Sequence, residues 1–158
     1  MRLKHIFWTA ALGATLVGCG GGGGGIGGDG GSLEGFLSTS DWVLGDGYYA
    51  DRYVFTASRD GQVQVDMGSN QVDPYLVVLD EDGNYLEDDD AGPGDDARLL
   101  FDVIRGRQYE VRATTFDQYD TGDYDLFWSR GLVFDGELRG RGDNQERLRA
   151  PQVKPKQP

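Results

Sequence analysis

Between Leu33 and Phe134 the chain alternates apolar and polar residues in short runs, and turn-forming residues separate these runs. One run, for example, has Val63, Val65 and Met67 at alternate positions with polar residues between them. Successive side chains of a β-strand point to opposite faces, so this alternation predicts strands with one buried face. No stretch shows a convincing helical period. The chain is therefore expected to fold as an all-β protein.

Six runs carry the alternation strongly enough to be assigned as strands. They cover residues 53–55, 63–67, 75–79, 99–101, 109–113 and 124–128. The run from Tyr75 to Leu79 is apolar on both faces, which is typical of a central strand. Gly, Asp and Asn between the runs tolerate the positive φ angles of tight turns. Seven or eight short, mostly antiparallel strands spaced in this way predict a compact, jelly-roll-like β-sandwich.

Four segments are expected along the chain: a signal peptide (1–18), a Gly-rich tether (19–32), the β-sandwich (33–134) and a disordered tail (135–158). Ten of the 14 residues in the tether are glycine, which favours a flexible coil. Three prolines in the charged tail favour disorder there. The signal peptide has a charged start and an apolar stretch from Ile6 to Val17, too short for the roughly 20 residues of a membrane-spanning helix.

The only cysteine, Cys19, ends the motif Leu16-Val17-Gly18-Cys19. This motif resembles the lipobox of bacterial lipoproteins, in which the cysteine is acylated and the chain is cut just before it. The resemblance implies a lipid anchor at Cys19 that holds the protein in a lipid bilayer of the bacterial cell envelope. Because Gly20 rather than aspartate follows, the sorting habits of lipoproteins imply the outer membrane. The alternative is an ordinary signal peptide with an incidental cysteine.

Charge is distributed unevenly along the chain. Residues 33–134 contain 22 Asp and Glu but only 7 Arg, whereas residues 135–158 contain 4 acidic and 6 basic residues. A folded surface this negative should repel nucleic acid and anionic lipid headgroups, and it should attract cations or basic partners. The only histidine, His5, lies in the signal peptide. Histidine-based triads and cysteine nucleophiles are therefore not expected in the mature chain.

Several landmarks follow one another in order along the expected sandwich. They are Gly45 to Phe55, Asp73 to Leu76, Leu79 to Asn84, Asp88 to Asp90, Gly106 to Val111, and Gly122 to Leu126. The series resembles the bacterial pre-peptidase C-terminal domain, a compact β-sandwich usually appended to secreted proteases. This resemblance implies an accessory role, such as assisting secretion, binding a macromolecular substrate or stabilising a neighbour, sometimes with calcium. No peptidase segment precedes the sandwich in this sequence, so we expect the domain to act alone or on a separate partner.

Five aspartates, Asp88, Asp89, Asp90, Asp95 and Asp96, surround a Gly-Pro-Gly turn and form the candidate calcium site. Ca²⁺ takes about six to eight hard oxygen ligands in flexible geometry, which carboxylates on such a turn can supply. The alternative is a solvated acidic loop that keeps a sheet edge soluble. An EF-hand is not indicated, because the twelfth residue counted from Asp80 is Ala91 rather than glutamate. The segment Asp82-Gly83-Asn84 instead predicts a hairpin turn.

Three aromatic residues, Phe116, Tyr119 and Phe127, are candidates for an exposed platform that binds a polysaccharide or a protein. The alternative is that they cover a sheet face or edge. The tripeptide Arg141-Gly142-Asp143 spells an integrin-binding motif, which we attribute to chance.

These observations predict a membrane-anchored, non-catalytic accessory or binding module of the bacterial cell envelope, with calcium stiffening its acidic loop. Two alternatives stay open. One is a structural envelope lipoprotein without a specific ligand. The other is a small carbohydrate-active enzyme that uses paired aspartates, which would need a cleft separating them by about 5 to 10 Å.

Overall fold

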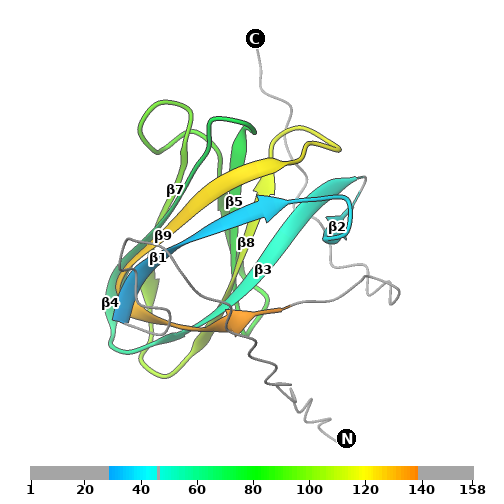
Figure 1. Cartoon of the computed structure of the whole chain (residues 1–158). Helices are drawn as coiled ribbons and strands as arrows, with labels where there is room; N and C mark the ends of the chain where they lie inside the picture. Colours follow the sequence, from blue (N-terminus) through cyan, green and yellow to red (C-terminus); the bar gives the residue numbers. More distant parts are fainter. Residues whose placement is uncertain (1–28, 46, 139–158) are drawn as a thin grey trace, which may run out of the picture.

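The computed structural model describes residues 29–45 and 47–138, and all regular structure within them is β-strand (Figure 1). The strands are β1 (Asp29–Leu37), β2 (Trp42–Leu44), β3 (Tyr48–Ala57), β4 (Gly61–Gly68), β5 (Pro74–Asp80), β6 (Tyr85–Asp88), β7 (Ala97–Val103), β8 (Gln108–Thr115) and β9 (Gly122–Glu137). All paired strands are antiparallel. The all-β prediction is confirmed, with nine strands where seven or eight were expected.

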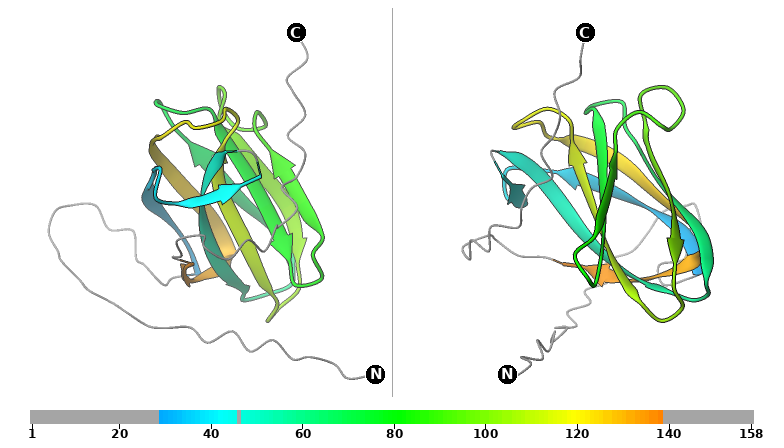
Figure 2. Two further views of the ribbon diagram at one scale, coloured as in Figure 1. Left: turned by 90° about the vertical axis from the view of Figure 1, so that its right-hand side faces the viewer. Right: turned by 180° about the vertical axis from the view of Figure 1, so that it is seen from behind.

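The strands form two layers that the long strand β9 connects (Figures 1 and 2). The first half of β9 lies between β1 and β4, and β4 pairs in turn with β7. The second half of β9 pairs with β3, which leads through β8 and β5 to β6, while β2 adds to the start of β3. One continuous sheet therefore folds over itself into a sandwich whose two layers share β9.

The bend of β9 lies at Gly131, where the strand passes from one layer to the other. Gly131 has a φ of 114°, and a Cβ there would approach Val63 Cγ1 to 2.7 Å. Only glycine adopts this conformation at little cost. The Gly131 backbone N–H donates to Asp29 Oδ1 at 2.6 Å, and this bond holds the pKa of the Asp29 carboxyl below its ordinary value.

The core lies between the layers and consists of the alternate residues that the sequence pattern assigned to buried faces. Val63, Val65 and Met67 of β4 are all at most 2% exposed. Phe55 packs edge-on against Trp128, with 5.2 Å between the ring centroids. Strand β5 is buried along both faces from Pro74 to Val78, as expected for an interior strand between two neighbours. The period-two pattern therefore located the core correctly.

Two segment boundaries differ from those expected. Residues 29–32, assigned to the flexible tether, belong to β1, and residues 135–137, assigned to the disordered tail, belong to β9. The glycines of β1 serve close packing, because a Cβ at Gly31 would approach Trp128 Cζ2 to 2.8 Å. The lipidation candidate Cys19 and the tripeptide Arg141-Gly142-Asp143 lie outside the described residues. Within the described residues, no helix has the length and apolarity needed to cross a membrane.

Candidate functional site

The five aspartates of the candidate calcium site lie in and around the loop between β6 and β7. Asp88 Oδ2 accepts hydrogen bonds from the backbone N–H groups of Ala91 and Arg98, both at 2.9 Å. The loop is closed by a further bond from Gly92 N–H to the Asp96 carbonyl at 2.8 Å. Within the described residues, no three acidic, histidine or cysteine side chains converge in a geometry that could hold a metal ion. Calcium binding by this loop stays a prediction.

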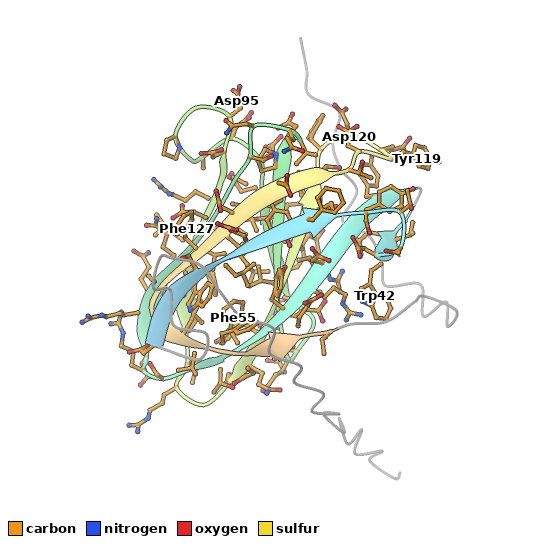
Figure 3. The ribbon with its side chains drawn as sticks, in the orientation of Figure 1. Trp42, Phe55, Asp95, Tyr119, Asp120 and Phe127 are labelled. Atoms are coloured by element: carbon orange, nitrogen blue, oxygen red, sulfur yellow. The ribbon has the colours of Figure 1, made fainter. Side chains whose placement is uncertain are left out.

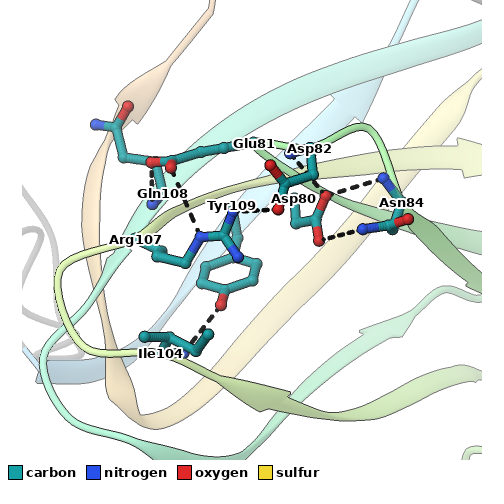
Figure 4. A network of polar contacts seen from close by, with 8 residues as sticks. All are labelled: Asp80, Glu81, Asp82, Asn84, Ile104, Arg107, Gln108 and Tyr109. Carbon is teal, nitrogen blue, oxygen red and sulfur yellow. Dashed lines mark hydrogen bonds and ion pairs between the residues drawn. The ribbon is translucent and has the colours of Figure 1, made fainter.

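The acidic turn between β5 and β6, at the other end of β6 from this loop, is fixed by its own hydrogen bonds (Figure 4). Asp80 Oδ1 accepts from the backbone N–H groups of Asp82 and Asn84, and Asp80 Oδ2 accepts from the Asn84 side chain, all at 2.9 Å. The Asn84 side chain contributes most to lowering the pKa of Asp80 below its ordinary value. Arg107 adds ion pairs to Glu81 and Asp82. The hairpin turn predicted for residues 82–84 is present.

The three candidate aromatic residues do not form one platform. Phe116 packs against Tyr75, with ring centroids 6.4 Å apart. Tyr119 lies across Gly47, where an added Cβ would come within 2.4 Å of its ring, and its backbone N–H donates to the Gly47 carbonyl. Phe127 projects outward from β9 with 49% of its surface exposed. Figure 3 shows Tyr119 and Phe127 at separate places on the molecule.

A cleft of about 450 Å³ opens where β1 faces β2 and β3, and we call it the acid-lined cleft. Its functional side chains come from four parts of the chain: Glu34 of β1, Asp41 and Trp42 at β2, Asp51 and Tyr53 of β3, and Glu137 of β9. None of the described residues that line it is Arg or Lys. Carboxylates gathered in a concave, protein-walled site focus a negative potential. The cleft is therefore suited to a positively charged group.

A buried chain of hydroxyl groups supports the base of this cleft. Tyr124 donates its hydroxyl to Asp51 Oδ2 at 2.6 Å, and the hydroxyls of Tyr124 and Tyr53 are 2.5 Å apart. Burial, followed by the nearby charges of Asp51, Glu137 and Asp41, raises the pKa of Tyr53. Burial likewise raises the pKa of Tyr124, so both phenols stay protonated and available as donors. All three carboxylates line the same cleft as Tyr53.

Gly35 of β1 leaves room for Tyr124 of the paired strand β9 to reach Asp51 and Tyr53. A Cβ at Gly35 would lie 2.1 Å from Tyr124 Cζ and 2.3 Å from its hydroxyl oxygen. Real Cβ atoms do not approach other heavy atoms this closely, so any side chain at position 35 would displace the Tyr124 ring. Glycine at this position is therefore part of the site, although the residue carries no functional group.

The outer wall of the cleft is held by an ion-pair cluster on β3 and β8. The Arg52 guanidinium lies 4.5 Å from the Trp42 ring centroid and also pairs with Glu110 at 2.7 Å. Arg112, 1% exposed, pairs with the same carboxylate at 2.6 Å. Although burial alone would raise the pKa of Glu110, these two guanidiniums hold it below its ordinary value. The cluster fixes Trp42, whose indole N–H donates to the Leu138 carbonyl at 2.9 Å.

A second groove of about 580 Å³ lies on the other side of Glu34 and Gly35. It brings together two residues that the sequence analysis assigned to different sites, Phe127 and Asp96. Amide and carboxylate side chains are among the other lining groups, and Gln71 Nε2 donates to Asp123 Oδ2 at 2.8 Å. The exposed aromatic ring beside polar side chains is an arrangement that suits a sugar or a peptide.

Sequence reasoning did not identify the acid-lined cleft, although one signal was present. Asp51, Tyr53 and Phe55 alternate, so they lie on one face of β3, and Phe55 is completely buried. An aspartate on the core-facing side of a strand needs a hydrogen-bond partner, which marks it as unusual. Its partner Tyr124 is 73 residues away in the sequence, so the pair itself could not be deduced.

Together these features define a small antiparallel β-sandwich with an acid-lined cleft beside its first strand. No family model and no curated protein match the chain. Among solved structures, it is similar to the pre-peptidase C-terminal domain of a collagenase from Bacillus anthracis, with 19% sequence identity and a TM-score of 0.47. The match covers 62% of this chain and 87% of that one. We transfer no residue role from it.

Proposed function

We propose that this protein is a non-catalytic binding module of the bacterial cell envelope, and that its acid-lined cleft binds a positively charged group of a partner. One observation carries the proposal: Glu34, Asp41, Asp51 and Glu137 line a single cleft of about 450 Å³ whose described lining contains no Arg or Lys. A lysine or arginine side chain, or a basic peptide, is the ligand class that fits this chemistry best.

The ion pairs of the folded part support the proposal, because none of them uses a carboxylate that lines the cleft. Four of the seven arginines in residues 29–138 form ion pairs with carboxylates that do not line the cleft: Arg98 with Asp66 at 2.5 Å, Arg107 with Glu81 and Asp82, and both Arg52 and Arg112 with Glu110. The acidic side chains of the cleft still give it a net negative charge, because no Arg or Lys is among the described residues that line it. Electrostatic attraction of this kind speeds association and falls with ionic strength.

The test uses tetra-arginine amide as the probe and isothermal titration calorimetry at low salt. Replacing Glu34 and Glu137 by glutamine should weaken binding roughly fivefold, because each partly exposed ion pair contributes about 0.2–1 kcal/mol. Asp102→Asn is the matched control, since Asp102 is exposed on β7 and lines neither groove. Equal affinities for the double variant and the control would exclude the cleft as the binding site.

The anchoring expected from the sequence completes the proposed function. Acylation of Cys19 would place the domain at a lipid bilayer. Gly20, the residue after Cys19, favours the outer membrane as its location. Multiple acyl chains make such anchoring stable, whereas a single chain binds only marginally. Calcium binding by the loop from Asp88 to Asp96 would require its carboxylates to move together, because they do not converge in this structure, and the bound ion would then stiffen the edge formed by β6 and β7.

The second groove supports a second candidate function, which is polysaccharide binding. Phe127 is 49% exposed there, beside the Gln71 and Asp123 side chains. Aromatic rings stack on the apolar faces of sugars while amides and carboxylates bind hydroxyls. Phe127→Ala should abolish retention on an insoluble glycan that the unaltered chain binds, and Phe36→Ala, at a residue 54% exposed outside this groove, is the control.

A further inference from the structure

The described part of the chain ends at the wall of the acid-lined cleft. Leu138 lines the cleft, its backbone N–H donates to the Arg52 carbonyl at 2.7 Å, and its own carbonyl accepts from Trp42 Nε1. Figure 3 shows Trp42 beside β3, and Trp42 is one of the residues that line the cleft. Whatever follows Leu138 in the sequence therefore begins at this site.

The segment that follows is opposite in charge to the rest of the protein. Residues 139–158 contain 6 Arg and Lys against 2 Asp and Glu, whereas residues 29–138 contain 25 Asp and Glu against 7 Arg. The first two basic residues, Arg139 and Arg141, come one and three positions after Leu138. Three residues span at most about 10 Å when extended, so both residues stay within that distance of Leu138 at the wall of the cleft.

We propose that the basic C-terminal segment, residues 139–158, binds the acid-lined cleft of its own chain and competes there with a positively charged partner. The inference rests on the proposed function, because it needs a cleft that receives cationic groups. Covalent attachment gives the segment an effective concentration in the millimolar range, which a free partner rarely reaches. The segment has few apolar residues, so its binding depends on charge and weakens as salt increases.

The competition should be modest in size. If the segment occupies the cleft most of the time, only a fraction of the molecules has an empty cleft. The apparent affinity of a competing ligand is reduced in proportion to that fraction. The segment would form a few partly exposed ion pairs with the cleft. Surface ion pairs contribute about 0.2–1 kcal/mol each, so we expect the affinity of the competing ligand to change three- to tenfold at low salt. The effect should disappear near 0.5 M salt, where the Debye length is only about 4 Å.

The experiment compares three full-length chains with tetra-arginine amide as the probe. The first is unaltered, the second has every Arg and Lys of residues 139–158 replaced by glutamine, and the third keeps those residues in a shuffled order. The neutralised chain should bind the probe three- to tenfold more tightly at low salt. The shuffled chain should behave like the unaltered one, because charge rather than sequence drives the contact. The inference would be overturned if the neutralised and unaltered chains bound the probe with equal affinity. It would also be overturned if the shuffled chain bound the probe as tightly as the neutralised chain.

The indole N–H resonances provide a readout that needs no ligand. The Trp42 signal should shift between the unaltered and neutralised chains, because this N–H bonds the last described carbonyl. Trp128, 4% exposed in the core, should stay unchanged. A probe that fails to bind the neutralised chain would refute the proposed function, and an unmoved Trp42 signal would refute the intramolecular contact.

Discussion

Substitution of Gly35 by alanine tests the geometry on which the acid-lined cleft depends. The new Cβ would lie 2.1 Å from Tyr124 Cζ, so the ring must move. Tyr124 is 3% exposed and is held by hydrogen bonds to Asp51 and Tyr53, which leaves it little room. Gly35 has no positive φ, so the expected cost arises from this contact and not from backbone strain.

The magnitude follows from two contributions. Overpacking a tight core costs about 1–3 kcal/mol, and the displaced Tyr124 hydroxyl loses hydrogen bonds worth about 1 kcal/mol each. We expect the free energy of unfolding to fall by about 2–4 kcal/mol. For a domain of this size, that loss corresponds to a melting temperature lower by roughly 10–20 °C.

Urea unfolding followed by tryptophan fluorescence measures the loss, and a double-mutant cycle with Tyr124→Leu identifies its cause. Once the ring is removed, Gly35→Ala should become neutral or stabilise by up to about 1 kcal/mol, because alanine loses less conformational entropy in a strand than glycine. If the alanine costs the same in both backgrounds, the contact with Tyr124 is not the reason that glycine occupies this position.

Three further predictions concern the ion-pair cluster, the acidic loop and the anchor. Glu110 has a lowered pKa, so its contribution to stability is complete above its ordinary value of 4.5 and is lost as the pH falls through the folded-state pKa. Glu110→Gln should therefore make stability fall less steeply below about pH 4. At pH 7 it should cost about 3 kcal/mol, because Arg52 and Arg112 lose their counter-charge. Parallel pH profiles of the variant and the unaltered chain in urea unfolding would contradict this. Thermal melts in millimolar calcium, in magnesium and with chelator should show a rise specific to calcium that the Asp89→Ala, Asp90→Ala double variant lacks, and the absence of any shift would leave the loop a solvated acidic face. Cys19→Ser should move the protein from the membrane to the soluble fraction of its host and remove the acyl mass seen by mass spectrometry, and an unlipidated, membrane-free parent chain would refute the anchor.

The sequence pattern located the strands whose apolar residues alternate without interruption. In β4 and in the first half of β9, the buried and exposed faces are those that the pattern assigned, including the outward position of Phe127. Such strands depend on residues next to each other in the chain, so the information is local. The hairpin turn at Gly83, with a φ of 81°, is local in the same way.

The sequence pattern missed β1 because its glycines have two physical meanings. A run of glycines favours a flexible coil when nothing packs against it. Gly31 and Gly35 instead leave room for Trp128 and Tyr124 of β9, about 90 residues further along the chain. The acid-lined cleft was missed for the same reason, since Asp51 of β3 meets its donor Tyr124 of β9 only in the folded sandwich. Local patterns cannot report contacts that the register of distant strands creates.

Strand β1 also connects the cleft to the proposed anchor. Glu34 and Gly35 border both grooves, and β1 begins at Asp29, only ten residues after Cys19. Ten residues span at most about 35 Å, so an acylated Cys19 would keep β1 within that distance of the bilayer surface. A partner that binds the cleft must then be present close to the membrane. A basic segment of an envelope protein meets this requirement, and repulsion between the acidic domain and anionic headgroups would orient the cleft away from the lipid and toward such a partner.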